Sequence, residues 1–323
     1  MGGNVRTYEM TWLGQPALAL ETDGLRVVTV PHMGAKIVSL FDKVAQREWL
    51  LPPINRPFMP VDYASVFVEQ DMSGWDEMFP NINAGEYPVE GEFHQRALPD
   101  HGEVWALPWA VDHVDEAHIQ LSTHGKALPY QLTRTIQVLG NQKIRLAFTA
   151  VNTGETPFVA FWTAHPQFIV DGETRIKLPA EVTQVVNVYS NLGLGEQGET
   201  CAWPSPESST GKTVHLDQVG GVELQDCRKF YLLPEQPVTW SALQQGDDGD
   251  WIRLSCDPSD VPYLGIWVDE GTYNAAPTVA LEPSSGFYDE LGVAWKNGRV
   301  VHFDPHVTVQ WSLDIELGSG TLS

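Results

Sequence analysis

The chain has 323 residues, of which 42% are hydrophobic and 19% charged, so it has enough apolar material for a large core and does not have a disordered composition. Its 42 acidic residues outnumber 19 basic ones, and the formal charge of −23 repels phosphodiester backbones and anionic lipid, which argues against nucleic acid and membrane partners. A sugar phosphate is disfavoured less strongly, because one local cluster of Arg or Lys can overcome the overall field.

Turn residues divide the chain into many short β-rich stretches. ETDG (21–24), NTGETP (152–157) and KNGR (296–299) each separate two of these stretches. Residues 62–71 can contain one helical turn, whereas the 28 Gly and 23 Pro disfavour long helices. We expect the linker-like segment 193–211 to be a long loop.

The clearest strands alternate apolar and polar residues, in segments 132–138 and 143–152. Between them, LGNQ (139–142) supplies the Gly and Asn that a tight turn needs, so the two segments predict a β-hairpin. Many short strands joined by turns are typical of an all-β sandwich or barrel. We expect a single domain over residues 1–323, because the alternation continues on both sides of the long loop.

The three cysteines, Cys201, Cys227 and Cys256, do not form a spacing that fits a disulfide framework or a structural zinc site. We expect them to be reduced and buried. No apolar run approaches the roughly 20 residues of a membrane helix, and the N-terminal sequence lacks an apolar stretch flanked by basic residues. These features predict a cytoplasmic protein.

Four regions combine special backbone residues with polar or aromatic side chains, as functional loops often do. They are SGWDEMFPNI from Ser73, LPDHGEVWALPW from Leu98, FWTAHPQF from Phe161, and LGIWVDE from Leu264 followed by VALEPSSGFYDEL from Val279. Within them, His101 and His165 can titrate near neutral pH and Glu282 supplies a carboxylate. General acid–base chemistry on a hydroxyl group requires this combination.

A GAKIVSL strand, an H-G-E-x-W loop, an H-P-x-F strand end and an L-E-P turn follow one another between residues 25 and 317. This succession resembles the aldose 1-epimerase family, also called galactose mutarotases. The resemblance implies an all-β fold with little helix, a large antiparallel β-supersandwich. It also implies a reaction that interconverts the α and β anomers of a free sugar and needs no cofactor and no metal.

By the same resemblance, Glu282 is the general base that removes the proton of the anomeric hydroxyl. His165 is the general acid that protonates the ring oxygen, and His101 assists by hydrogen bonding near that oxygen. Each positioned acid or base contributes roughly 100- to 10,000-fold to such a reaction. We also expect partial burial against aromatic neighbours to raise the pKa of Glu282, and the candidates are Phe287, Tyr288 and Trp267.

Four further residues are candidates for binding the sugar. Trp267 and Trp105 can stack on its apolar faces. Asp76 and Glu77 can take the place of an aspartate that relatives use to hold sugar hydroxyls. If this segment is extended, only one of the two faces the cleft, because adjacent strand residues point to opposite sides.

Two other functions remain open. A hexose-6-phosphate 1-epimerase needs a cluster of basic side chains, and the sequence shows only scattered ones near the candidate loops. A non-catalytic carbohydrate-binding protein of the same fold needs no matched acid and base, so the presence of all three acid–base residues argues against it. In each case we expect a small-molecule carbohydrate as partner, and a monomer or a homodimer.

Overall fold

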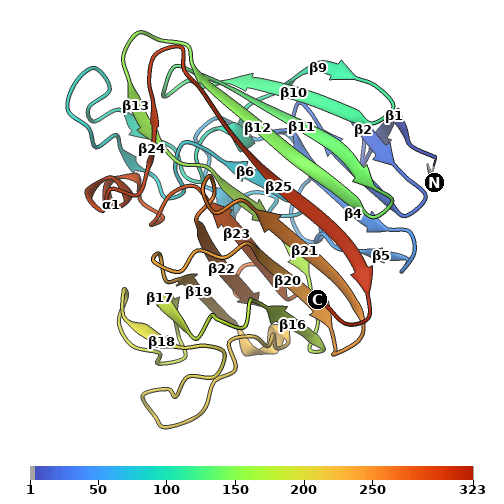
Figure 1. Cartoon of the computed structure of the whole chain (residues 1–323), viewed down its shortest axis with the longest axis vertical. Coiled ribbons are helices and arrows are strands. Elements are labelled where there is room, and N and C mark those ends of the chain that lie inside the picture. Colours follow the sequence, from blue (N-terminus) through green and yellow to red (C-terminus); the bar gives the residue numbers. More distant parts are fainter. Residues whose placement is uncertain (1–3, 323) are drawn as a thin grey trace.

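A computed structural model describes residues 4–322 and consists mainly of two antiparallel β-sheets (Figure 1). The larger sheet has thirteen strands in the order β1-β2-β3-β4-β6-β14-β23-β22-β19-β17-β18, with β5 paired to β4 and β15 to β23. Its strands are β1 (Arg6–Trp12), β2 (Gln15–Glu21), β3 (Leu25–Val30), β4 (Lys36–Asp42), β5 (Arg47–Glu48), β6 (Trp75–Met78), β14 (Thr163–Pro166), β15 (Phe168–Ile169), β17 (Gln184–Ser190), β18 (Thr200–Ala202), β19 (Asp226–Leu232), β22 (Tyr263–Glu270) and β23 (Thr278–Ser284).

The second sheet has eight strands in the order β16-β20-β21-β25-β12-β11-β10-β9 and lies in front of the larger sheet in Figure 1. Its strands are β9 (Ala110–Val114), β10 (His118–His124), β11 (Tyr130–Gly140), β12 (Lys143–Asn152), β16 (Thr174–Lys177), β20 (Trp240–Gln245), β21 (Asp250–Cys256) and β25 (Thr308–Ser319). Apolar side chains from both sheets meet in one large hydrophobic core. The predicted antiparallel all-β fold with little helix is therefore confirmed.

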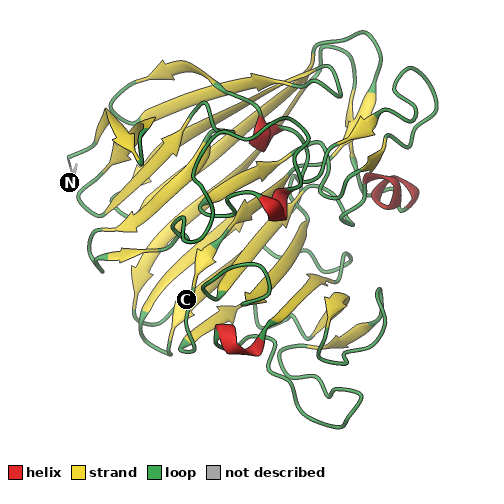
Figure 2. Cartoon of the chain, turned by 180° about the vertical axis from the view of Figure 1, so that it is seen from behind, coloured by secondary structure: helices red, strands yellow, loops and turns green. Residues whose placement is uncertain are grey.

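Small elements complete the structure. Two-stranded pairs are formed by β7 (Gly85–Glu86) with β8 (Ala97–Leu98) and by β13 (Phe158–Ala160) with β24 (Val301–Phe303). The helical segments are α1 (Leu291–Lys296) and the 3-10 turns η1 (Phe67–Glu69), η2 (Val104–Ala106) and η3 (Val222–Leu224). Figure 2 shows that loops carrying short helices cross in front of the strands of the larger sheet. Within residues 4–322, no helix is long and apolar enough to cross a membrane.

The predicted hairpin is confirmed, because β11 and β12 pair antiparallel and place Leu132 opposite Ala150. The helical turn expected within residues 62–71 is η1. The expectation of a β-rich stretch before residues 296–299 is wrong. Helix α1 precedes this turn, because Leu291 and Ala294 are three residues apart and can both be buried on one helical face.

The long loop at 193–211 is largely irregular, but its residues 200–202 form β18 and extend the sheet edge beside β17. Of the three cysteines, all are free thiols, as predicted, but only Cys227 is fully buried. Cys201 and Cys256 are partly exposed, which corrects the expectation that all three are buried.

Candidate active site

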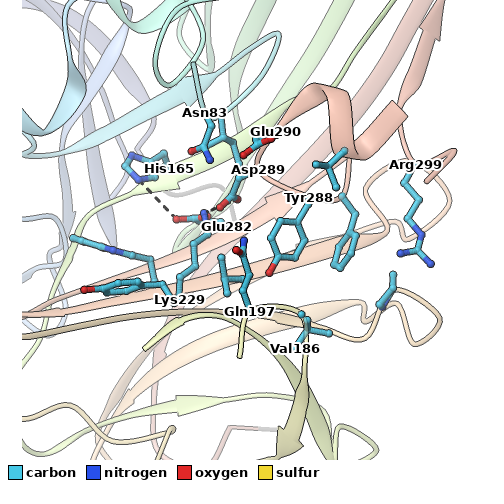
Figure 3. A pocket seen from close by; sticks show the side chains of 18 of the residues that line it. Asn83, His165, Val186, Gln197, Lys229, Glu282, Tyr288, Asp289, Glu290 and Arg299 are labelled. Atoms are coloured by element: carbon cyan, nitrogen blue, oxygen red, sulfur yellow. Dashed lines mark ion pairs between the residues drawn. The ribbon is translucent and has the colours of Figure 1, made fainter. Parts of the chain in front are cut away.

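A cavity of about 840 Å³ is lined by β14, β17, β19, β22 and β23, by the segment 287–299 that follows them, and by earlier loops that include Asn83 and His101 (Figure 3). His101, His165 and Glu282 all line this cavity. The structure thus brings together the three side chains that the sequence motifs singled out, although they lie far apart along the chain.

Strand pairing explains how the floor of the cavity is assembled. Gly265 lies opposite Glu282 on β23 and opposite Tyr231 on β19. Two residues further along these strands, Lys229 lies opposite Trp267. Because side chains alternate along a strand, Lys229 and Trp267 project from the same face of the sheet as Tyr231. A β-carbon at Gly265 would lie 3.1 Å from Glu282 Oε2, so the glycine leaves room for the carboxylate.

Glu282 is the buried carboxylate at the centre of the site, with 1% of its surface exposed. Its Oε2 lies 2.8 Å from Lys229 Nζ, and its Oε1 lies 3.8 Å from His165 Nε2. Burial raises the pKa of Glu282, while the charge of Lys229 counteracts part of that rise. The direction of this shift agrees with the prediction made from the sequence, and it makes the carboxylate a stronger base than an exposed one.

Lys229 is shared between two carboxylates. Its Nζ lies 2.9 Å from Asp289 Oδ1, and Tyr231 donates its hydroxyl proton to the same oxygen at 2.6 Å. Burial alone would lower the pKa of Lys229, but Asp289 and Glu282 outweigh burial and raise it. The lysine is therefore positively charged and fixes the position of Glu282.

His165 is buried beside Glu282. Burial, followed by the nearby charges of His101 and Lys229, lowers the pKa of His165 well below its usual range. Gln167 lies 3.4 Å from its Nε2, whereas its Nδ1 has no hydrogen-bond partner in the described part of the chain. At neutral pH the imidazole is mainly uncharged, and its protonated form is a stronger acid than ordinary histidine.

His101 lies next to His165, with the ring centroids 5.1 Å apart. Its ring stacks on Phe67, and its Nδ1 lies 3.0 Å from Asp100 Oδ1, which orients the imidazole and leaves Nε2 for another partner. The backbone of His101 has φ 59°, a left-handed conformation that residues other than glycine rarely adopt. Such local strain is often found where a side chain is held in position for function.

The two predicted tryptophans differ in position. Trp267 lines the cavity, whereas Trp105 does not. Trp105 packs edge-on against Phe67 and donates its Nε1–H to the backbone oxygen of Asp100 at 3.0 Å. The prediction that Trp105 contacts the sugar is corrected, because Trp105 supports the loop that carries His101.

Asp76 and Glu77 also lie outside the cavity lining. Asp76 pairs in register with His165 on the neighbouring strand, but its carboxylate faces Lys36 Nζ at 2.9 Å. Glu77 points to the opposite side and forms an ion pair with Arg134 at 3.0 Å between the two sheets. The predicted alternation is thus observed, but neither carboxylate is placed to hold a sugar hydroxyl, because neither lines the cavity.

Sequence reasoning missed Lys229, Asp289 and Tyr231. The residues DCRKFYL of β19 place Lys229 and Tyr231 on one face of the strand, which was a weak sign of a polar site. The L-E-P segment, expected to be a turn, lies within β23, and Asp289 follows it by only a few residues, which was another available sign. Within residues 4–322, no group of three or more His, Cys, Asp or Glu side chains is arranged to hold a metal ion.

No family profile matches the sequence, and no curated protein is detectably similar to it. Solved structures are similar over nearly the whole chain. A galactose mutarotase related enzyme from Lactobacillus acidophilus has 16% identity and a TM-score of 0.69, over 94% of this chain and 98% of that one. A galactose mutarotase-like protein from Clostridium acetobutylicum has 13% identity and a TM-score of 0.68, over 98% and 99% of the two chains. The chain therefore has the galactose mutarotase-like fold that its motifs predict.

Proposed function

We propose that the protein is an aldose 1-epimerase that interconverts the α and β anomers of a neutral free sugar. One observation carries this proposal: Glu282 Oε1 and His165 Nε2 lie 3.8 Å apart at the buried floor of a cavity that can hold a sugar ring. Ring opening requires that one oxygen lose a proton while another oxygen close by gains one. An adjacent carboxylate and imidazole can perform both transfers.

In the proposed reaction, Glu282 accepts the proton of the anomeric hydroxyl, and the C1–O1 bond becomes a carbonyl. The C1–O5 bond breaks, and its electron pair takes a proton from His165. His101, oriented by Asp100, hydrogen bonds near the same oxygen. The open-chain aldehyde rotates about C1–C2, and the reverse proton transfers close the ring on the other face.

The productive state has an ionised Glu282 and a protonated His165. Burial disfavours each charge alone, but at 3.8 Å the opposite charges stabilise one another. The raised pKa of Glu282 strengthens the base, and the lowered pKa of His165 strengthens the acid. Environments that shift two neighbouring groups in this way are typical of acid–base sites.

The charges around the cavity favour a neutral sugar over a sugar phosphate. Arg299 forms an ion pair with Glu235 at 2.7 Å, and Lys229 lies between Glu282 and Asp289. Both of these cavity-lining cations are thus already matched by carboxylates. A phosphate would have to displace one of those partners.

Polarimetry tests the proposal. Freshly dissolved α-glucose, α-galactose, rarer aldoses and glucose 6-phosphate are followed with the wild-type protein and with Glu282→Gln. We expect faster mutarotation that falls by roughly 100- to 10,000-fold in the variant, which keeps the shape of the side chain but removes the base. Sugar binding without acceleration would instead support the carbohydrate-binding protein. Acceleration confined to hexose 6-phosphates would support the phosphate-specific epimerase.

A further inference from the structure

The cavity is larger than a single sugar ring at the acid–base residues would fill. Its volume of about 840 Å³ is near the upper end of the roughly 300–1,000 Å³ typical of sites for drug-sized ligands, which are much larger than one sugar ring. Figure 3 shows His165, Lys229 and Glu282 on one side, and Val186 and Arg299 toward the other side. The cavity therefore contains room for a group attached to the reacting sugar.

The far side of the cavity carries an apolar and aromatic surface. We call Val186, Leu233, Phe287 and Tyr288 the outer subsite; all four line the cavity and belong to one hydrophobic cluster. The rings of Phe287 and Tyr288 meet edge-on, with centroids 5.1 Å apart. Tyr288 is only partly buried, so part of its side chain remains accessible.

Polar side chains accompany this aromatic surface. Gln197 and Asn297 are exposed and line the same cavity, as does Arg299 with its partner Glu235. A sugar ring has apolar C–H faces that stack on aromatic rings, and hydroxyl groups at its edge that need hydrogen-bond partners. Gln197 and Asn297 can supply such partners to the hydroxyl groups of a second ring, whereas a purely apolar substituent would not use them.

The outer subsite is continuous with the acid–base residues. Lys229, which holds Glu282, also contacts Asp289, and Asp289 accepts the hydroxyl proton of Tyr231. The ring of Tyr231 stacks on that of Tyr288, with centroids 5.2 Å apart. One ligand can therefore contact both parts of the cavity.

We propose that the outer subsite binds the second ring of a reducing disaccharide, whose reducing ring lies at Glu282 and His165. The identity of the reacting ring rests on the proposed function. The outer ring takes no part in proton transfer, so its contacts strengthen binding without changing the chemical step. The expected effect therefore appears in KM rather than in kcat.

Binding measurements test this proposal without turnover. Titration calorimetry on the Glu282→Gln protein compares maltose, lactose and cellobiose with glucose and galactose. We expect at least one disaccharide to bind about tenfold more tightly than its reducing monosaccharide, from stacking on the outer subsite. Adding Tyr288→Ala should reduce this ratio toward one. Val111→Ala, an exposed substitution on β9 outside the cavity, should leave the ratio unchanged.

A second variant covers the case in which Tyr288→Ala does not fold. Leu233→Trp, also in the Glu282→Gln background, adds bulk in the outer subsite and should weaken disaccharide binding more than monosaccharide binding. Equal affinities for mono- and disaccharides in the Glu282→Gln protein would overturn the proposal, as would a ratio that neither substitution lowers. Disaccharide preference without mutarotation by the wild-type protein would reject only the proposed function. Rapid mutarotation of monosaccharides without that preference would reject only the outer subsite.

Discussion

Glu77 and Glu282 are both buried carboxylates beside a cation, yet only Glu282 lines the cavity. Glu77 lies 3.0 Å from Arg134 and accepts a hydrogen bond from Trp162 Nε1 at 2.8 Å, inside the sandwich. Glu282 lies 2.8 Å from Lys229 at the floor of the cavity. Burial raises the pKa of both, that of Glu77 to about 7. A shifted pKa therefore does not by itself identify a catalytic group, and access to a ligand distinguishes the two sites.

The cations differ as well. Arg134 spreads its donors over Glu77, Thr29 Oγ1 and the backbone oxygen of Ala35, so it ties strands of both sheets together. Lys229 is shared by two carboxylates that both line the cavity. The hydrogen-bonding groups of Arg134 are thus used inside the protein, whereas both carboxylates beside Lys229 belong to the cavity wall.

The largest expected effect is on activity and uses matched substitutions. Glu282→Gln should slow mutarotation by roughly 100- to 10,000-fold, whereas Glu77→Gln should leave the rate per folded molecule within about threefold. Polarimetry on protein quantified by its folded fraction measures both. Equal losses in the two variants would contradict the distinction drawn between the sites.

Substitutions at the ion pair of Glu77 and Arg134 should instead change stability more than activity. Arg134→Leu leaves Glu77 buried without its cation and should lower the free energy of unfolding by about 3–5 kcal/mol, measured by urea denaturation. The double variant with Glu77→Leu should recover part of that loss, because no buried charge remains. A double variant less stable than Arg134→Leu alone would show that the ion pair is not the source of the effect.

The ionisation of Glu282 tests how Lys229 acts on this residue. Glu282 can act as the proposed base only when ionised, and its ionised fraction is lost as pH falls through its raised pKa. Lys229→Gln removes a charge that lowers this pKa, so the midpoint of carboxylate ionisation, followed by infrared difference spectroscopy against Glu282→Gln, should move to higher pH. Lys143→Gln, at the partly exposed start of β12, is the control. An unmoved midpoint would mean that Lys229 does not act on the ionisation of Glu282.

The smallest expected effect separates the two tryptophans. Trp267→Phe reduces the aromatic surface that lines the cavity and should raise KM by about two- to tenfold. Trp105→Phe removes a hydrogen bond to Asp100 and should lower the free energy of unfolding by about 1 kcal/mol, with a smaller change in KM. A larger KM effect at Trp105 would show that this residue contacts the ligand after all.

Local patterns in the sequence were sufficient for several features. The alternation in residues 132–152 predicted the hairpin of β11 and β12, since burial on one side of a strand imposes a period of two. The motif order predicted the fold and singled out His101, His165 and Glu282, which the structure brings to one cavity. Helix α1 escaped prediction because six residues are too few to show a helical period.

Only the tertiary structure decided which buried polar residues meet. Periodicity indicates that Lys229 and Tyr231 share a face of β19. It does not indicate that Glu282 lies on β23, with only β22 between the two strands. For the same reason, alternation separated Asp76 from Glu77 without showing that Lys36 and Arg134 bind them. Sheet order joins residues distant in the sequence, and the ion pairs that set charge and access in the site depend on that order.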